Sequence, residues 1–183
     1  YKDDNLHGIS IDYDSTGKKD SEKRFKSGLK DGEWNFYNDD VELVHVEIYE
    51  DDLKNGLWYT KDLDTRDIHY EEYRDDKFIV RYTEHYYPNY QLKEKYAYQD
   101  SLPHGKWIGY YKDGETKHVK RFEDGKKQGK WQFFTEGGDV HTFELYENDK
   151  RNGEWYKKGE ETDIYYQFWD MDSLISEYAD LHY

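Results

Sequence analysis

Histidine recurs at four related positions, and a column of imidazoles can bind zinc through neutral ring nitrogens. Each histidine follows an aromatic residue of the repeat described below by 10 or 11 residues; the four are His45, His69, His118 and His141. Lys93 interrupts the column between its two pairs. We therefore interpret these histidines as a polar row on a solvent-facing strand, and we predict no metal site and no cofactor.

Alternating carboxylates between residues 62 and 67 have a spacing that could hold calcium through oxygen ligands. The run reads DLDTRD and lacks the glycine and the distal glutamate of a calcium-binding loop. We expect an Asp-rich turn at this place.

Residue patterns for catalysis are missing from the sequence. No serine lies in a Gly-x-Ser-x-Gly context, and no glycine-rich phosphate loop opens a helix. Paired carboxylates are abundant, but the open sheet predicted below offers no desolvated pocket that would shift their pKa values. The sequence therefore predicts a protein that is not an enzyme.

The composition combines high charge with many aromatic residues. Charged residues make up 38% of the 183 residues, hydrophobic residues make up 34%, and the net charge is −15. This combination is typical of disorder, but an aromatic content of 19% favours strands and supplies buried area. We expect a thin folded structure with a core of Tyr, Trp and Phe.

Six aromatic anchors recur at intervals of 24 or 25 residues. Five of them follow a glycine by two residues, and Val80 replaces that glycine before the sixth. The anchors are Trp34, Trp58, Tyr82, Trp107, Trp131 and Trp155, and the glycines are Gly32, Gly56, Gly105, Gly129 and Gly153. A period of this length indicates a repeat array.

Each unit contains an aromatic-rich run, a turn, a second run that ends on an aromatic residue, and a second turn. Two short strands and two turns account for the period, and Asp, Asn and Gly suit tight hairpin turns. The sequence therefore predicts an all-β fold: one elongated antiparallel sheet of about seven stacked hairpins. We expect a single domain over residues 1–183, with repeats from about 6 to 169.

The C-terminal segment 170–183 breaks the repeat. Leu174, Ile175, Tyr178 and Leu181 have helical spacing, and Asp172 or Ser173 could cap a helix start. We predict a short amphipathic helix that covers the last strand, because terminal repeats need caps.

The pattern Gly-x-Trp-x-x-Tyr-Tyr, followed by Phe/Tyr-x-x-Gly-x-x-x-Gly-x-Trp, is clearest in residues 105–131. It resembles the MORN-repeat variant of bacterial proteins, and in particular the YwqK-type antitoxin family. The resemblance implies an antitoxin or immunity protein that neutralises a secreted polymorphic toxin. Other MORN proteins are scaffolds, so a structural or cell-surface scaffold is the alternative. The unit from Tyr82 departs from the pattern, because it lacks both the glycine and the tryptophan.

Acidic charge concentrates in residues 39–76, which hold 14 acidic and 4 basic residues. Such a surface disfavours nucleic acid and anionic lipid but would steer a basic protein, such as a toxin domain, towards it. The alternative is that these carboxylates keep a Tyr-rich sheet soluble. The predicted partner-binding residues are Asp51, Asp52, Asp62, Asp64, Asp67, Glu71, Glu72, Asp75 and Asp76.

The compartment and the oligomeric state are left open by the sequence. The chain has no cysteine and no apolar run long enough to span a membrane. We expect a cytoplasmic protein. Because the chain begins at Tyr1, removal of a signal peptide would instead indicate a periplasmic or cell-surface location.

Overall fold

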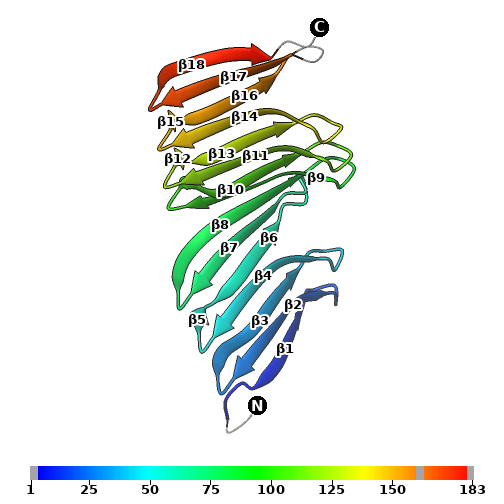
Figure 1. Ribbon diagram of the computed structural model, residues 1–183. Helices are drawn as coiled ribbons and strands as arrows, with labels where there is room; N and C mark the ends of the chain where they lie inside the picture. The colour runs from blue at the N-terminus through cyan, green and yellow to red at the C-terminus, as the bar shows by residue number, and fades with distance from the viewer. Residues whose placement is uncertain (1–3, 160–162, 181–183) are drawn as a thin grey trace. The chain divides into compact units, whose positions relative to one another are not determined.

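The computed structural model describes residues 4–159 and 163–180. These residues form 18 β-strands and no helix, and the strands belong to one antiparallel sheet, which confirms the predicted all-β fold of repeated hairpins (Figure 1). Contacts divide the chain into two units, Tyr1–Thr83 and Glu84–Tyr183.

The first unit is built from hairpins in chain order, whose successive long strands pair antiparallel. Its strands are β1 (Gly8–Tyr13), β2 (Lys19–Lys26), β3 (Leu29–Tyr37), β4 (Leu43–Glu50), β5 (Leu53–Lys54), β6 (Gly56–Lys61), β7 (Ile68–Arg74) and the first part of β8 (Lys77–Tyr86). Strands β5 and β6 both pair with β4, so they are two halves of one interrupted strand.

The second unit repeats this construction after the last residues of β8. Its strands are β9 (Leu92–Gln99), β10 (Leu102–Tyr110), β11 (Thr116–Glu123), β12 (Lys126–Lys127), β13 (Gly129–Phe134), β14 (Val140–Glu147), β15 (Lys150–Arg151), β16 (Gly153–Lys158), β17 (Ile164–Asp170) and β18 (Ser173–Asp180). The short strands β12 and β15 precede the same interruption as β5.

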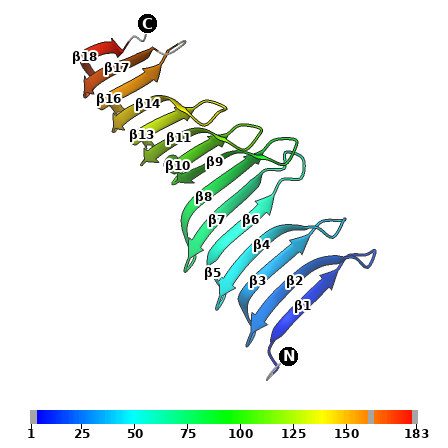
Figure 2. The same cartoon turned by 45° about the vertical axis from the view of Figure 1, so that its right-hand side comes forward.

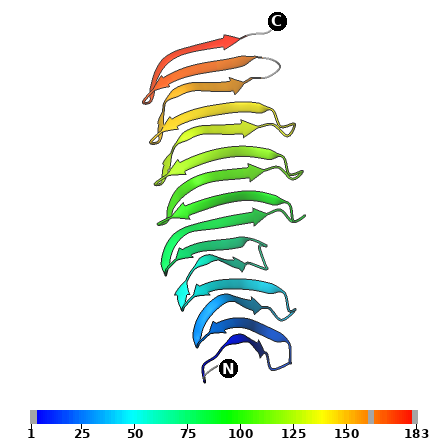
Figure 3. The ribbon, with the colours of Figure 1, turned by 60° about the horizontal axis from the view of Figure 1, so that its bottom comes forward.

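Two kinds of turn alternate within each unit, and they lie at opposite ends of the strands (Figure 3). The short turns have two central residues with positive φ, as in Asp51 (47°) and Asp52 (71°), which is the conformation that matches the twist of a hairpin. Longer loops, such as residues 38–42 and 62–67, connect the strands at the other edge. We call these the short-turn edge and the loop edge.

Each Gly-x-Trp pair lies at an irregularity of the ladder: three pairs follow a break in the strand, and Gly32 and Gly105 lie at a register shift within β3 and β10. Gly129 adopts a φ of +66°, and the Nε1–H of Trp131 donates to the carbonyl of Arg121 at 3.0 Å. The indole thereby satisfies a backbone acceptor beside the break in the ladder. Four further pairs use the same bond, at 2.9–3.0 Å: Trp34 with Arg24, Trp58 with Ile48, Trp107 with Ala97, and Trp155 with Leu145.

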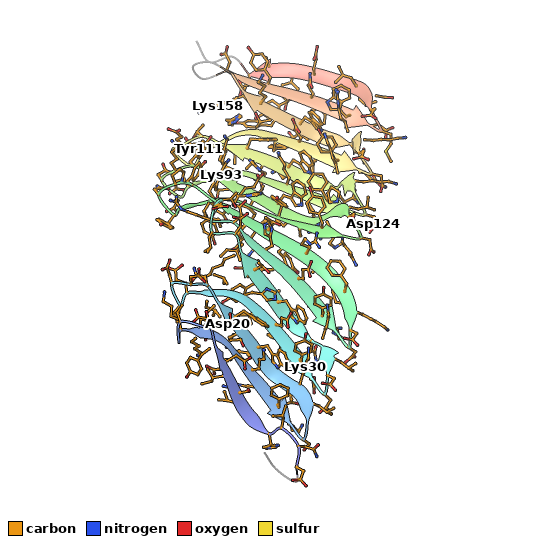
Figure 4. The ribbon with its side chains drawn as sticks, turned by 180° about the vertical axis from the view of Figure 1, so that it is seen from behind. Asp20, Lys30, Lys93, Tyr111, Asp124 and Lys158 are labelled. Atoms are coloured by element: carbon orange, nitrogen blue, oxygen red, sulfur yellow. The ribbon has the colours of Figure 1, made fainter. Side chains whose placement is uncertain are left out.

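One face of each unit carries a continuous row of aromatic rings, which we call the Trp face. In the first unit, Trp58 lies between Tyr49 and Tyr73, with ring centroids 5.2 and 5.0 Å away, and Trp58 is only 7% exposed. Lysines cover the row: the Nζ of Lys30, labelled in Figure 4, lies 4.2 Å from the centroid of Trp34. The described residues form no second layer over the sheet, so these rings form the core by burying one another. In the second unit the row comprises Tyr98, Trp107, Phe122, Trp131, Tyr146, Trp155 and Trp169.

Tyr82 is placed differently from the five tryptophan anchors. Arg81 and Thr83 contact Glu71 and His69, which lie on the Trp face. Because side chains alternate along a strand, Tyr82 points to the opposite face. Val80 stands where the other repeats have a glycine, and β8 contains no residue with positive φ, so the shift made by the glycine elsewhere is missing.

The predicted C-terminal helix is wrong for the described residues. Residues 173–180 form β18, which pairs with β17 in an antiparallel register (residues 181–183, including Leu181, lie outside the described residues). Met171 and Asp172 form a two-residue turn with φ values of 44° and 74°. A two-turn helix has few hydrogen bonds to offset its nucleation, whereas a hairpin turn lets the same residues pair along all of β17.

Candidate protein-binding surface

The nine predicted acidic residues do not form one site. Asp51, Asp52, Asp75 and Asp76 lie in turns of the short-turn edge, whereas Asp62, Asp64 and Asp67 belong to a loop of the opposite edge. Glu71 is paired in register with Trp58 on the Trp face, and Glu72, its neighbour in the strand, points to the other face. The second unit has the same two edges, marked by Asp124 and Tyr111 in Figure 4.

Two of the short-turn aspartates form hydrogen bonds with the backbone of the preceding repeat. The Oδ1 of Asp76 accepts the N–H of Lys54 at 2.7 Å, and the N–H of Asp76 donates to the carbonyl of Lys54 at 3.0 Å. Asp52 makes the same pair of bonds with Lys30. We call this arrangement the turn clasp. It joins successive turns in a row, as the aromatic rings join successive strands.

The turn clasp recurs in the second unit, at Asp149 with Lys127 and at Asp172 with Arg151. Two glycine turns differ: Gly125 donates its N–H to the carbonyl of Pro103 at 2.9 Å, and Gly28 of the first unit donates to the carbonyl of Leu6 at 2.8 Å. Proline has no N–H, so no carboxylate is needed opposite it. At the Gly125 turn, the residue types on the two sides therefore match.

Replacing Asp76 with alanine should lower the free energy of unfolding by about 1–2 kcal/mol, because it leaves the Lys54 amide without its acceptor. Asp75→Ala is the matched control: Asp75 is adjacent and exposed, and its φ is also positive. Urea unfolding of both variants measures the difference. Equal losses would show that backbone strain, rather than the clasp, explains the effect.

The carboxylates of Asp62 and Glu71 also accept hydrogen bonds from other residues of the fold. The Oδ1 of Asp62 accepts the N–H groups of Asp64 and Thr65 at 2.9 and 3.0 Å, and the bond from Thr65 is the main cause that holds its pKa below the ordinary value. Burial alone would raise the pKa of Glu71, but hydrogen bonds from Tyr73 and Arg81 outweigh it and lower the pKa. Both carboxylates therefore stay ionised in fixed positions.

Tyrosine–glutamate pairs recur along the Trp face. The hydroxyl of Tyr73 donates to Glu71 at 2.7 Å, and that of Tyr146 donates to Glu144 at 3.1 Å. Burial, helped by these carboxylates, raises the pKa of each tyrosine to about 12. The hydroxyls therefore remain donors at neutral pH, and the glutamates of these pairs act inside the sheet.

Three other carboxylates are exposed on the loop edge of the first unit. Those of Asp39, Asp40 and Asp64 make no hydrogen bond or ion pair within the part of the chain that the structure describes. The loops that carry them are held from inside: Asn38 Oδ1 accepts the N–H groups of Asp40 and Glu42, as Asp62 does in the next loop. We call these three residues the acidic loop edge.

Sequence reasoning selected Asp64 but not Asp39 or Asp40. All three lie in the same acidic stretch, and residue type alone does not separate a free carboxylate from one that caps a turn. The useful signal was positional: Asn38 and Asp62 each begin a loop, where such side chains commonly bond to the backbone two residues on. The carboxylates of the residues that follow Asn38 and Asp62 therefore remain exposed to solvent.

The histidine column is held by local partners. His45 Nδ1 lies 2.7 Å from Thr60 Oγ1, and His69 Nδ1 lies 3.2 Å from Thr83 Oγ1. Burial lowers the pKa of His118, which lies against Gly109. Among residues 4–159 and 163–180, no group of three His, Cys, Asp or Glu side chains could hold a metal ion. No described helix could span a membrane.

A hollow of about 480 Å³ opens on the Trp face of the second unit, lined in part by Glu144, Trp155 and Lys157. The Trp155 ring already packs between Tyr146 and Trp169, at 5.3 and 5.9 Å. The Trp155 ring is therefore already in contact within the sheet, whereas Tyr165, which also lines the hollow, is 45% exposed.

Compared with known proteins, the chain matches no family model and no curated protein. Its function is therefore argued from the surfaces of the two units.

Proposed function

We propose that this chain is a non-catalytic protein-binding repeat protein, and that its first unit captures a basic partner protein through the acidic loop edge. The observation that carries the proposal is the pair of pre-organised loops that present Asp39, Asp40 and Asp64 to solvent. Opposite charges steer encounter and raise the association rate. Because the loops are already ordered by Asn38 and Asp62, little conformational entropy is lost on binding.

The most specific form of the proposal is an immunity or antitoxin protein that blocks a cognate toxin by steric and electrostatic occlusion. The resemblance of the repeats to the YwqK-type antitoxin family supports it, as does the net charge of −10 over residues 39–76. A toxin that attacks nucleic acid needs a basic surface for phosphate, and an acidic inhibitor is complementary to that surface.

A structural or cell-surface scaffold is the second candidate. The first strand favours it, because Ile9, Ile11 and Tyr13 of β1 are 56%, 43% and 62% exposed. An exposed apolar strand can pair with another chain. A scaffold should self-associate or bind several partners weakly, whereas an inhibitor should bind one basic partner tightly.

The test is association with the protein encoded by the adjacent gene, measured at low and high salt. The double charge reversal Asp39→Lys with Asp64→Lys should reduce the association rate about 10–100-fold at low salt and leave the urea midpoint unchanged. The matched control reverses Glu136 and Asp139, which lie on a loop of the same edge in the second unit. An unchanged rate, or equal losses in variant and control, would reject the acidic loop edge as the interface.

A further inference from the structure

The second unit carries another aromatic row, on the face opposite its Trp face. Phe143 is paired in register with Tyr156, Tyr156 with Tyr166, and Tyr166 with Tyr178. Their ring centroids are 5.3, 5.7 and 4.8 Å apart. These four residues, which we call the tyrosine row, cross β14, β16, β17 and β18 (Figure 2). The row follows the strand order and ends on β18.

The outer end of the tyrosine row is open to solvent. The Tyr178 ring stacks on Tyr166 at an interplanar angle of 19°, yet Tyr178 is 51% exposed. At the other end, the Nζ of Lys130 lies 4.0 Å from the centroid of Phe143. The row therefore already binds one cation on this face, as expected of an aromatic surface with its negative ring faces exposed.

Strand β18 also offers an open backbone edge. It pairs antiparallel with β17, with a register shift that leaves Ile175 unmatched, and all eight of its residues are exposed, including Ile175 at 65% and Leu174 at 45%. An edge strand with free N–H and C=O groups and apolar side chains accepts an additional strand from another chain. Charged edge residues that block such pairing are usually lysines, and β18 contains none.

The charge around β18 defines the partner. Residues 159–183 contain seven acidic residues and no basic residue. On the tyrosine-row side, burial, Tyr166 and the carboxylates of Glu154 and Asp180 together raise the pKa of Tyr178. A second copy of this chain would bring its own Glu177 and Asp180 against the same strand, and like charges directly opposite destabilise pairing. A basic segment is complementary instead.

We propose that β18 binds an extended basic segment of a partner protein as an additional strand, with an arginine or lysine of that segment over Tyr178. This inference rests on the proposed function, because it gives the same class of basic partner a second point of contact. Main-chain hydrogen bonds supply the pairing, and the two faces of β18 supply the selectivity. On one face the segment meets Tyr178 and Asp180; on the other it meets Glu177, with Ile175 near it at the register shift of β18.

The preferred segment alternates basic and apolar residues, because successive side chains of an added strand reach opposite faces. A basic side chain contacts Tyr178 and Asp180, and its apolar neighbour covers Ile175. Both Ile175 and Tyr178 are exposed, so substituting them should disturb the fold little.

The experiment titrates the full-length chain with a synthetic peptide of alternating arginine and valine, followed by amide NMR. We expect shifts centred on β18 and β17. Tyr178→Ala and Ile175→Lys should each weaken binding at least about tenfold, the first through the lost ring contact and the second through charge repulsion and a blocked edge. The matched control is Ile9→Lys on the exposed strand β1, which should leave binding unchanged.

Three outcomes would overturn the inference. The first is equal binding of a peptide of alternating glutamate and valine, and the second is the absence of shifts on β18 with the arginine peptide. The third is a concentration-dependent dimer abolished by Ile175→Lys, which would identify a second copy as the occupant. The reversal of Asp39 and Asp64 should leave peptide binding intact, so failure of the acidic loop edge and failure of β18 are told apart.

Discussion

Replacing Trp131 with alanine should lower the free energy of unfolding by about 3–5 kcal/mol. Trp131 is 6% exposed and lies between Phe122 and Tyr146, each with a ring centroid 5.1 Å away. The substitution removes both ring contacts and also the hydrogen bond to the Arg121 carbonyl. The sheet has no second layer to close over the gap, so little relaxation can offset the loss.

Urea unfolding measures this loss, and Trp131→Phe separates its two causes. Phenylalanine keeps an aromatic ring in the row but cannot donate to Arg121, so it should cost about 1–2 kcal/mol for the unpaired carbonyl, with some further loss of contact area. A loss below about 1 kcal/mol for the alanine variant would mean that the rings are not the core of the unit.

Replacing Gly105 with valine should lower the free energy of unfolding by about 2–3 kcal/mol, because the residue would be held in a left-handed conformation that β-branched side chains rarely adopt. Its φ is +68°, and a Cβ at this position would meet no atom within 4 Å. Overlap of the Cβ itself is thus excluded, which leaves the left-handed backbone as the main source of strain. This makes Gly105 a cleaner test than Gly153, where a Cβ would approach Leu145 to 3.1 Å.

Gly105→Asn is the control for this prediction. Asparagine tolerates the left-handed region, so it should lose less than about 1 kcal/mol, and urea unfolding again provides the measurement. If asparagine and valine were equally damaging, then the position would require glycine for a reason other than its φ. The comparison also tests the interruption itself, since the Trp107–Ala97 hydrogen bond depends on this glycine placing the indole.

The architecture was predictable from the sequence because a local mechanism is repeated. Gly129 and Trp131 lie two residues apart and act together, through a positive φ and an indole hydrogen bond, so their recurrence marks every interruption. The failure at Tyr82 has the same origin. The spacing continued through Val80, but without the glycine the side chains of β8 changed faces, and spacing alone does not report on faces.

The candidate site was only partly predictable, because the use of a carboxylate depends on what the stacked hairpins bring beside it. Asp76 and Asp75 are identical neighbours in sequence, yet only Asp76 meets an amide of the preceding repeat, 22 residues earlier. The C-terminal segment shows the same limit. Its apolar spacing fits a short helix, and the availability of β17 as a pairing partner decided the outcome.

Because of the turn clasp, each repeat can follow only a repeat whose backbone groups match the residue in its own turn. A turn with aspartate suits a preceding repeat that offers an amide, as Lys127 does, whereas the Gly125 turn suits one that offers only a carbonyl, as Pro103 does. Exchanging single repeats would leave an amide without an acceptor or a carboxylate without a donor. Grafting or duplication should therefore succeed when adjacent repeats are moved as matched pairs, so the chain is less modular than its regular period suggests.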